Sequence, residues 1–282
     1  MTLIARYSLA EAVRRRIFTI IVGLTALFLV IFAFGTFAVF DEVEGQGFVG
    51  SDLIEERALT GGTLIGIGMF VIFFLGVVLG VFMTASTVRG DAERGTLAPL
   101  VVRPIGRDSV LLGRLLAAAG VAMAYAALVF AAVVLITWLA GDWSPDRLLT
   151  PALALTGAVA IVTALSVLGS VYLSANANGI AIFMVFGAGL TAGLMNQIGE
   201  ALNSSRLQEI ADAATVLMPF EALYQAGLHE LTADTRGLTD VAVELGPFGG
   251  AEAAGAGILL WSILYGAAAV ALAVRGFRRV DL

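Results

Sequence analysis

The chain has 282 residues, of which 59% are hydrophobic and 13% are charged, and its formal net charge is −6. Soluble domains usually carry about 45–50% apolar and about 25% charged residues, so this composition indicates an integral membrane protein. Cysteine is absent, which excludes disulfides, thiolate nucleophiles and cysteine-based metal sites.

Six apolar runs have no charged side chain near their centres and are long enough to cross a bilayer, which takes about 20 helical residues. Arginines precede the first run as they would in a signal peptide, but this run is too long for one and five more follow it. We therefore predict an all-α membrane protein whose residues 1–282 form one transmembrane domain. The predicted spans are residues 17–40, 61–88, 111–140, 150–174, 179–198 and 255–274.

The N-terminal segment, residues 1–16, is expected to form an amphipathic helix ahead of the first span. Leu3, Tyr7 and Val13 recur at three- and four-residue spacing, while arginines take the other face. Such a helix lies in the inner interface with its arginines against anionic headgroups. The alternative is that the arginines only flank the span and set its orientation. The basic residues assigned to this interfacial helix are Arg6, Arg14, Arg15 and Arg16.

The distribution of arginine predicts the orientation of the spans. All 16 basic residues of the chain are arginines. If the N-terminus is cytoplasmic, six spans leave both termini inside, and the inner segments then hold 12 of these 16 arginines. This is the expected positive-inside orientation. Residues 89–110 then form the one substantial cytoplasmic loop, and residues 199–254 form an extracytoplasmic region.

The side chains present exclude several classes of function. A P-loop needs the lysine of GxxxxGK[ST] and the chain has none, so any ATP would have to be bound by another chain. His229 is the single histidine, and without a second histidine or a cysteine nearby a metal site is not expected. Ion-coupled carriers usually keep charged residues within their spans, and the six runs have none near their centres.

The polar residues of the spans are uncharged. We expect them to form hydrogen bonds between helices, the alternative being that they line a substrate path. They are Thr84, Ser86, Thr163, Ser166, Ser170, Tyr172, Asn178, Asn196 and Gln197. Three glycine pairs with GxxxG spacing are expected to allow close packing of helices: Gly62–Gly66, Gly76–Gly80 and Gly189–Gly193.

Residues 88–113 interrupt the apolar chain with a dense segment of both charge signs, VRGDAERGTLAPLVVRPIGRDSVLLG. Asp91 and Glu93 suit the positive end of a short helix through ERGTLAPLV, which places Leu97 and Leu100 on one face. The proline and glycine of RPIG are expected to end this helix and turn the chain. The residues alone leave two interpretations open: a solvated loop whose arginines set topology, or a docking helix beneath the membrane.

The region before the last span contains a second amphipathic pattern. Leu207, Ile210 and Leu217 share one face, and Pro219 then interrupts the pattern. We expect two short helices here, resting on or dipping into the outer leaflet. The rest of the region is expected to be a solvated loop, with a role in substrate gating as the alternative.

ERGTL at 93–97, followed by RPIGRDSVLLGR at 103–114, resembles the hallmark of ABC-2-type permeases. In that family a Glu-x-Gly-Thr-Leu element precedes a Pro-x-x-Arg turn and an Ile/Leu-Leu-Gly-Lys/Arg entry into the third span. The resemblance extends over the whole chain and includes LMPFEALYQAGL at 217–228, which is similar to the family's proline-centred segment. Arg114 stands where lysine is usual, and the charge is kept.

The resemblance implies one permease subunit of an ATP-driven exporter in the plasma membrane of a prokaryote. Two such permeases, identical or related, would pair with two cytoplasmic ABC ATP-binding subunits, which would bind the ATP and Mg²⁺. The loop after span two would be the coupling helix, seated in a groove of the ATPase. The residues this implies for the contact are Asp91, Glu93, Arg94, Gly95, Thr96, Leu97, Leu100, Arg103, Pro104 and Arg107.

The same resemblance places the translocation path at the dimer interface, lined by spans one, two and five. It implies that this chain is not an enzyme and binds no cofactor and no nucleic acid. Two other functions are kept as alternatives: a membrane anchor or regulatory component without transport, and an ion-coupled carrier.

Overall fold

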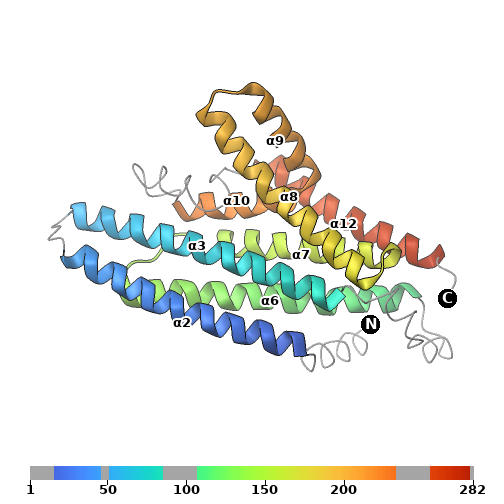
Figure 1. Cartoon of the computed structure of the whole chain (residues 1–282), viewed down its shortest axis with the longest axis horizontal. Coiled ribbons are helices and arrows are strands. Elements are labelled where there is room, and N and C mark those ends of the chain that lie inside the picture. The colour runs from blue at the N-terminus through green and yellow to red at the C-terminus, as the bar shows by residue number, and fades with distance from the viewer. Residues whose placement is uncertain (1–15, 46–50, 85–106, 233–254, 280–282) are drawn as a thin grey trace.

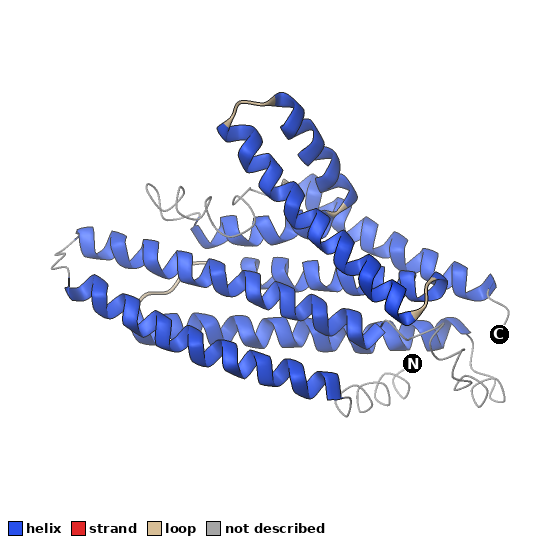
Figure 2. Ribbon diagram, viewed as in Figure 1, coloured by secondary structure: helices blue, strands red, loops and turns tan. Residues whose placement is uncertain are grey.

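The computed structural model describes residues 16–45, 51–84, 107–232 and 255–279, and the regular secondary structure within these ranges is helical throughout (Figure 2). This confirms the predicted all-α fold. The described ranges contain eight helices: α2 (Arg16–Gly45), α3 (Ser51–Thr84), α6 (Arg107–Gly141), α7 (Leu149–Tyr172), α8 (Ala175–Ala201), α9 (Ser205–Leu217), α10 (Pro219–Thr232) and α12 (Ala256–Arg279).

Six of these helices, α2, α3, α6, α7, α8 and α12, are long and apolar enough to cross a membrane, which confirms the number of predicted spans. Each continues beyond its predicted apolar run at one or both ends. α3 differs most, since it begins at Ser51, whereas the apolar run begins at residue 61. The added turns carry Glu56 and Arg57, which a search for apolar runs leaves out but which suit a helix end that reaches the polar interface.

The centre of the bundle is formed by α3 and α7. α3 packs against α2, α6 and α7, while α7 also packs against α8, α10 and α12 (Figure 1). The most apolar stretch is 67% buried in α3 and 56% buried in α7, but only 17% buried in α2 and in α12. The first and last spans therefore flank the core and leave most of their apolar surface exposed.

The two ends of the bundle are distinguished by their ion pairs. At one end Arg278 of α12 binds Asp108 of α6, and we call this the Asp108–Arg278 end. The start of α2, the end of α3 and the α7–α8 turn lie at the same end (Figure 1). At the other, the Arg147–Glu230 end, Arg147 after α6 binds Glu230 of α10 over 2.9 Å.

The two short helices expected before the last span are present, and they differ in burial. α9 lies antiparallel along α8 and is mostly exposed, with Ala211 as its one buried residue. Met218 separates it from α10, in which every residue from Pro219 to Leu228 is buried. α10 therefore does not rest on a surface: it packs inside the bundle against α3, α7, α8 and α12.

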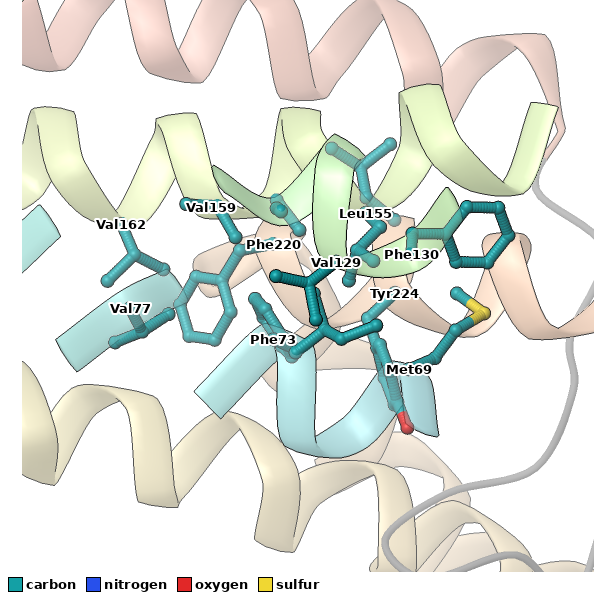
Figure 3. Packing of buried hydrophobic residues seen from close by; sticks show 14 of the residues in the cluster. Met69, Phe73, Val77, Val129, Phe130, Leu155, Val159, Val162, Phe220 and Tyr224 are labelled. Atoms are coloured by element: carbon teal, nitrogen blue, oxygen red, sulfur yellow. The ribbon is translucent and has the colours of Figure 1, made fainter. Parts of the chain in front are cut away.

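Aromatic rings join α10 to the core of the bundle. Phe73 of α3 stacks on Tyr224 of α10 with ring centroids 5.0 Å apart (Figure 3). Phe73 also meets Phe186 of α8 edge to face at 5.1 Å. Phe220 of α10 lies 6.2 Å from Phe186. Aromatic pairs at such distances add about 0.5–1.5 kcal/mol each beyond the area they bury, so this cluster helps to hold α10 between the spans.

Two of the predicted glycine pairs allow close packing of described helices. A Cβ atom at Gly76 would lie 3.0 Å from Val159 of α7, and one at Gly80 would collide with Thr163 of the same helix. The pair therefore brings α3 directly against α7, as expected for small residues at a membrane-helix contact. The pair Gly189–Gly193 of α8 faces α10 in the same way.

Candidate functional site

The Asp108–Arg278 end is closed by a bidentate ion pair. Arg278 Nε donates to Asp108 Oδ1 at 2.9 Å and to Oδ2 at 3.1 Å, and a terminal guanidinium nitrogen also donates to Oδ2. Asp108 lies in the first turn of α6 and Arg278 in the last turn of α12, so each charge also complements the dipole of its own helix. The pair ties the last span to the helix that follows residues 85–106.

A buried polar network joins three spans near the same end. The Thr84 hydroxyl of α3 donates to Ser166 Oγ of α7 at 2.7 Å. The Asn178 amide of α8 donates to the Ser166 backbone carbonyl at 2.9 Å and lies 3.3 Å from its hydroxyl. All three residues are at most 1% exposed. The last described residue of α3 is therefore fixed to both α7 and α8.

Asn178 also brings α7 and α8 into close contact. Its Oδ1 atom is buried without a hydrogen-bond partner, and it lies where a Cβ atom on Gly169 would be. An unpaired buried acceptor weakens a network, because its desolvation is uncompensated by about 1–3 kcal/mol. The absence of a side chain at Gly169 is what lets Asn178 reach Ser166.

Two other span hydroxyls form hydrogen bonds within their own helix, and Ser86 lies outside the described residues. Thr163 donates to the Val159 carbonyl at 2.8 Å, and Ser170 donates to the Val167 carbonyl at 2.7 Å. The expected hydrogen bonding between helices is thus confirmed for Thr84, Ser166 and Asn178. Thr163 and Ser170 do not contribute to it, since a hydroxyl in a helix can satisfy itself on the preceding turn.

One further hydrogen bond attaches the first span. Thr25 of α2 and Tyr125 of α6 have their hydroxyl oxygens 2.6 Å apart, and Thr25 also donates to the Ile21 carbonyl at 2.8 Å. Because so little of α2 is buried, this bond is a notable part of its contact with α6.

A comparison with known proteins identifies the family. A family model described as ABC-2 family transporter protein matches residues 2–282. The chain belongs to the ABC-2 transporter family. The matched family model describes the membrane component of such a transporter. A search of curated proteins found no match.

The residues predicted to contact an ATPase lie almost entirely outside the described part of this ABC-2 chain. Arg107 is the first residue of α6, and Arg16 is the first residue of α2. Three interfacial-helix residues fall within 1–15, which is also outside the described ranges: Arg6, Arg14 and Arg15. The coupling residues outside them are Asp91, Glu93, Arg94, Gly95, Thr96, Leu97, Leu100, Arg103 and Pro104.

Two functional candidates in the ABC-2 chain escaped the sequence analysis. Glu221 and Gln225 of α10 are 3% and 4% exposed, and the Gln225 amide donates to Glu221 Oε1. Both residues lie outside the six apolar runs, in a segment that the positions of the arginines assign to the extracytoplasmic side. The available signal was a single acid and a single amide, spaced i and i+4, in an otherwise apolar stretch after Pro219.

The Gly189–Gly193 pair of α8 forms the notch that receives these side chains. A Cβ atom at Gly193 would lie 2.5 Å from Gln225 Nε2 and would collide with Glu221 Oε1. A Cβ atom at Gly189 would lie 2.7 Å from the Phe220 ring.

The described surface of the bundle also has two apolar grooves. One of about 630 Å³ lies between α6, α7, α10 and α12, and one of about 560 Å³ lies between α6 and α7. Small residues of α7, including Ala154 and Gly157, line the larger groove. Within the described ranges no group of three or more His, Asp or Glu side chains is arranged to hold a metal ion.

Proposed function

We propose that this chain is the permease subunit of an ATP-driven ABC exporter and works as a dimer with two separate ATP-binding subunits. The family match over residues 2–282 is the observation that carries the proposal. The partner subunits would bind ATP and Mg²⁺, because the chain has no lysine and hence no P-loop of its own. The dimer would consist of two copies of this chain or of this chain and a related permease.

Coupling to the ATPase would occur through residues 89–110. These residues follow Thr84 and lead into α6, so a force on them acts directly on two spans of the bundle. Leu97 and Leu100 would fill a groove of the ATPase, and Glu93 and Arg103 would form pairs at its rim that fix the register. ATP-driven closure of the ATPases would move this segment and switch the spans between two rigid-body states.

The Asp108–Arg278 end would face the cytoplasm of a prokaryotic cell, with both termini inside. Its described helix ends carry Arg275, Arg278 and Arg279, in keeping with the enrichment of positive residues on that side. Residues 1–16 would lie in the inner interface as an amphipathic helix. Residues 199–254 would form the extracytoplasmic region, from which α10 dips back between the spans.

The translocation path would lie at the interface of the two permeases, along α2, α3 and α8. Two exposed phenylalanines of α3, which pack against rings of α8, support this position. Phe74 lies 6.3 Å from Phe186, and Phe82 lies 6.4 Å from Phe183, although α3 is otherwise the most buried span. Phe74 and Phe82 are 43% and 42% exposed, so a second copy could bury them.

The test is co-purification of an ATP-binding subunit with membrane-inserted variants. We expect Leu97→Asp to remove the partner and Glu93→Ala to weaken its coupling, because these changes put a charge in the groove contact or remove a rim charge. Val102→Asp, in the same segment but off the predicted ridge, and Glu209→Ala on exposed α9 are the matched controls. Full ATPase binding and transport in both Leu97→Asp and Glu93→Ala would exclude the docking role.

A further inference from the structure

The larger of the two apolar grooves opens onto the surface of the bundle. It lies between α6, α7, α10 and α12 and has a volume of about 630 Å³. Small residues of α7 line it, namely Ala154, Gly157 and Ala160. Two more of its lining residues, Leu116 of α6 and Ile263 of α12, are exposed. The groove is therefore a slot in the outer surface of the spans and not a closed cavity in their core.

The lining of this groove changes from polar to apolar along its length. Thr150 and Glu230 line it at the Arg147–Glu230 end, in the first turn of α7 and the last turn of α10. Toward the Asp108–Arg278 end it is lined by Leu115, Ala164 and Val270, which belong to or pack against a buried apolar cluster. The groove thus has a polar mouth and an apolar closed end, which suits an amphiphile with a hydrocarbon chain.

The length of the groove fits an acyl chain. Thr150 and Ala164 lie fourteen residues apart on α7, which corresponds to about 21 Å at a rise of about 1.5 Å per residue. One leaflet of the hydrocarbon core is about 15 Å thick, half of about 30 Å. Between the two ends the described lining has one polar side chain, Ser262, which donates to the Ile258 carbonyl of its own helix at 2.8 Å. The interior of the groove therefore offers hydrocarbon surface over the full depth of a leaflet.

The tryptophans of the chain place the polar mouth at a membrane surface. All three lie at the Arg147–Glu230 end: Trp138 in the last turn of α6, Trp143 shortly after that helix, and Trp261 in the second turn of α12. Tryptophan is enriched where a membrane protein meets the lipid headgroups. Trp261 is held in place, because its ring nitrogen donates to the Val216 carbonyl at 2.8 Å. The groove beyond the mouth then lies in the hydrocarbon region, where lipid chains surround it.

Charges of both signs lie at the mouth, and acids are in excess. Arg147 binds Glu230 over 2.9 Å, and both side chains are partly exposed. Asp142 and Asp146, in the same connection between α6 and α7, are also exposed. A head group that carries a phosphate and an ammonium group matches both signs, whereas a purely anionic head group meets the excess of acids.

We propose that this groove binds an acyl chain of a phospholipid with an ammonium head group, from the leaflet at the Arg147–Glu230 end. The phosphate lies against the Arg147 guanidinium, and the ammonium group lies against the Glu230 carboxylate. The chain fills the slot between α12 and the α6–α7 pair, whose walls would otherwise lack dispersion contacts. The lipid thereby fixes the last span, of which the most apolar stretch is only 17% buried by the protein itself. The proposal depends neither on an ATPase partner nor on transport.

The test is native mass spectrometry of the full chain released from nanodiscs with equal amounts of phosphatidylethanolamine and phosphatidylglycerol. We expect the wild type to retain one phosphatidylethanolamine, and Ala160→Phe, which fills the groove, to retain none. Ala268→Phe places the same ring on an exposed position of α12, on the face opposite to Ile263 and Gly266, and should retain the lipid.

Three outcomes of this experiment would overturn the proposal. The first is a wild type without lipid, or one that retains phosphatidylglycerol instead. The second is equal retention by the wild type and Ala160→Phe. The third is a lipid-free dimer that Ala160→Phe disrupts, because the groove would then be the seat of a second copy of the chain.

A second variant covers the case in which Ala160→Phe does not fold. Glu230→Gln removes the negative charge at the mouth and leaves the apolar part of the groove unchanged. We expect it to lose the preference for phosphatidylethanolamine over phosphatidylglycerol, whereas Glu209→Gln on exposed α9 should keep that preference. An unchanged preference in Glu230→Gln would overturn the assigned head group and with it the proposed site.

Thermal unfolding provides a readout besides the retained lipid. A ligand that binds only the folded chain stabilises it. We therefore expect phosphatidylethanolamine, added to the chain in detergent micelles, to raise the unfolding temperature of the wild type and of Ala268→Phe but not that of Ala160→Phe. Equal rises in the wild type and Ala160→Phe would contradict the proposal.

Discussion

Thr84, the last described residue of α3, donates a hydrogen bond to Ser166 of α7 over 2.7 Å. The side-chain amide of Asn178 on α8 donates to the backbone carbonyl of the same serine, so three spans meet at one residue. The segment proposed to contact the ATPase, residues 89–110, begins five residues after Thr84. Movement of that segment would therefore act on α7 and α8 as well as on α3, without any change in the packing of the core above them.

Asn178→Leu is expected to destabilise the bundle. The substitution removes the hydrogen bond to the Ser166 carbonyl and leaves that site without its amide donor. Hydrogen bonds between membrane helices average about 0.6 kcal/mol and reach about 1.7 kcal/mol. Because leucine also removes the unpaired Oδ1 of Asn178, we expect a net loss near the lower value. The measurement is the free energy of unfolding in mixed micelles. Asn176→Leu, an exposed position on the same helix, is the control and is expected to change it far less.

The notch in α8 makes a second prediction. Gly193→Ala introduces a Cβ atom that collides with Glu221 and Gln225, so we expect a loss of about 1–3 kcal/mol in unfolding free energy, as for overpacked cores. Gly187→Ala, six residues earlier on α8, meets no atom within 4 Å and is expected to be neutral or stabilising by up to about 1 kcal/mol. Equal effects of the two substitutions would mean that α10 is not seated in this notch.

The six spans were predictable because a charged side chain in the bilayer is very unfavourable. A long apolar stretch without charged residues is therefore enough to identify a span. The ends of α3 were not, since the helix continues through charged turns that no hydropathy pattern includes. The burial of α10 was also hidden, because a 14-residue helix is too short to read as a span and its acid suggested water. Glu221 becomes a candidate only once the neighbours of α10 are known, which depends on contacts between distant segments.

The attachment of the first span makes a third prediction. Tyr125→Phe removes only the hydroxyl that lies 2.6 Å from Thr25, and Thr25 keeps its bond to the Ile21 carbonyl. Because no buried group is left unpaired, we expect a small loss of about 0.5 kcal/mol, at the low end for a hydrogen bond. Unfolding in mixed micelles measures it. The double variant with Thr25→Val should then add little, whereas independent, additive effects of the two changes would contradict a direct bond.

The ion pair at the Asp108–Arg278 end makes the last prediction, which concerns mobility because both side chains are exposed. Asp108→Asn is expected to loosen the end of α12, and the charge-exchanged chain, Asp108→Arg with Arg278→Asp, is expected to restore most of the order. The chain has no cysteine, so a spin label on Arg279→Cys reports this end alone. In the labelled chain that keeps Asp108 and Arg278, the lines of the electron paramagnetic resonance spectrum should be narrower at high salt than at low salt. Salt screens an exposed ion pair, so the helix end becomes more mobile. If Asp108→Asn leaves the spectrum unchanged at low salt, packing of Gly276 against Val171 and Tyr172, rather than the ion pair, is what orders this helix end.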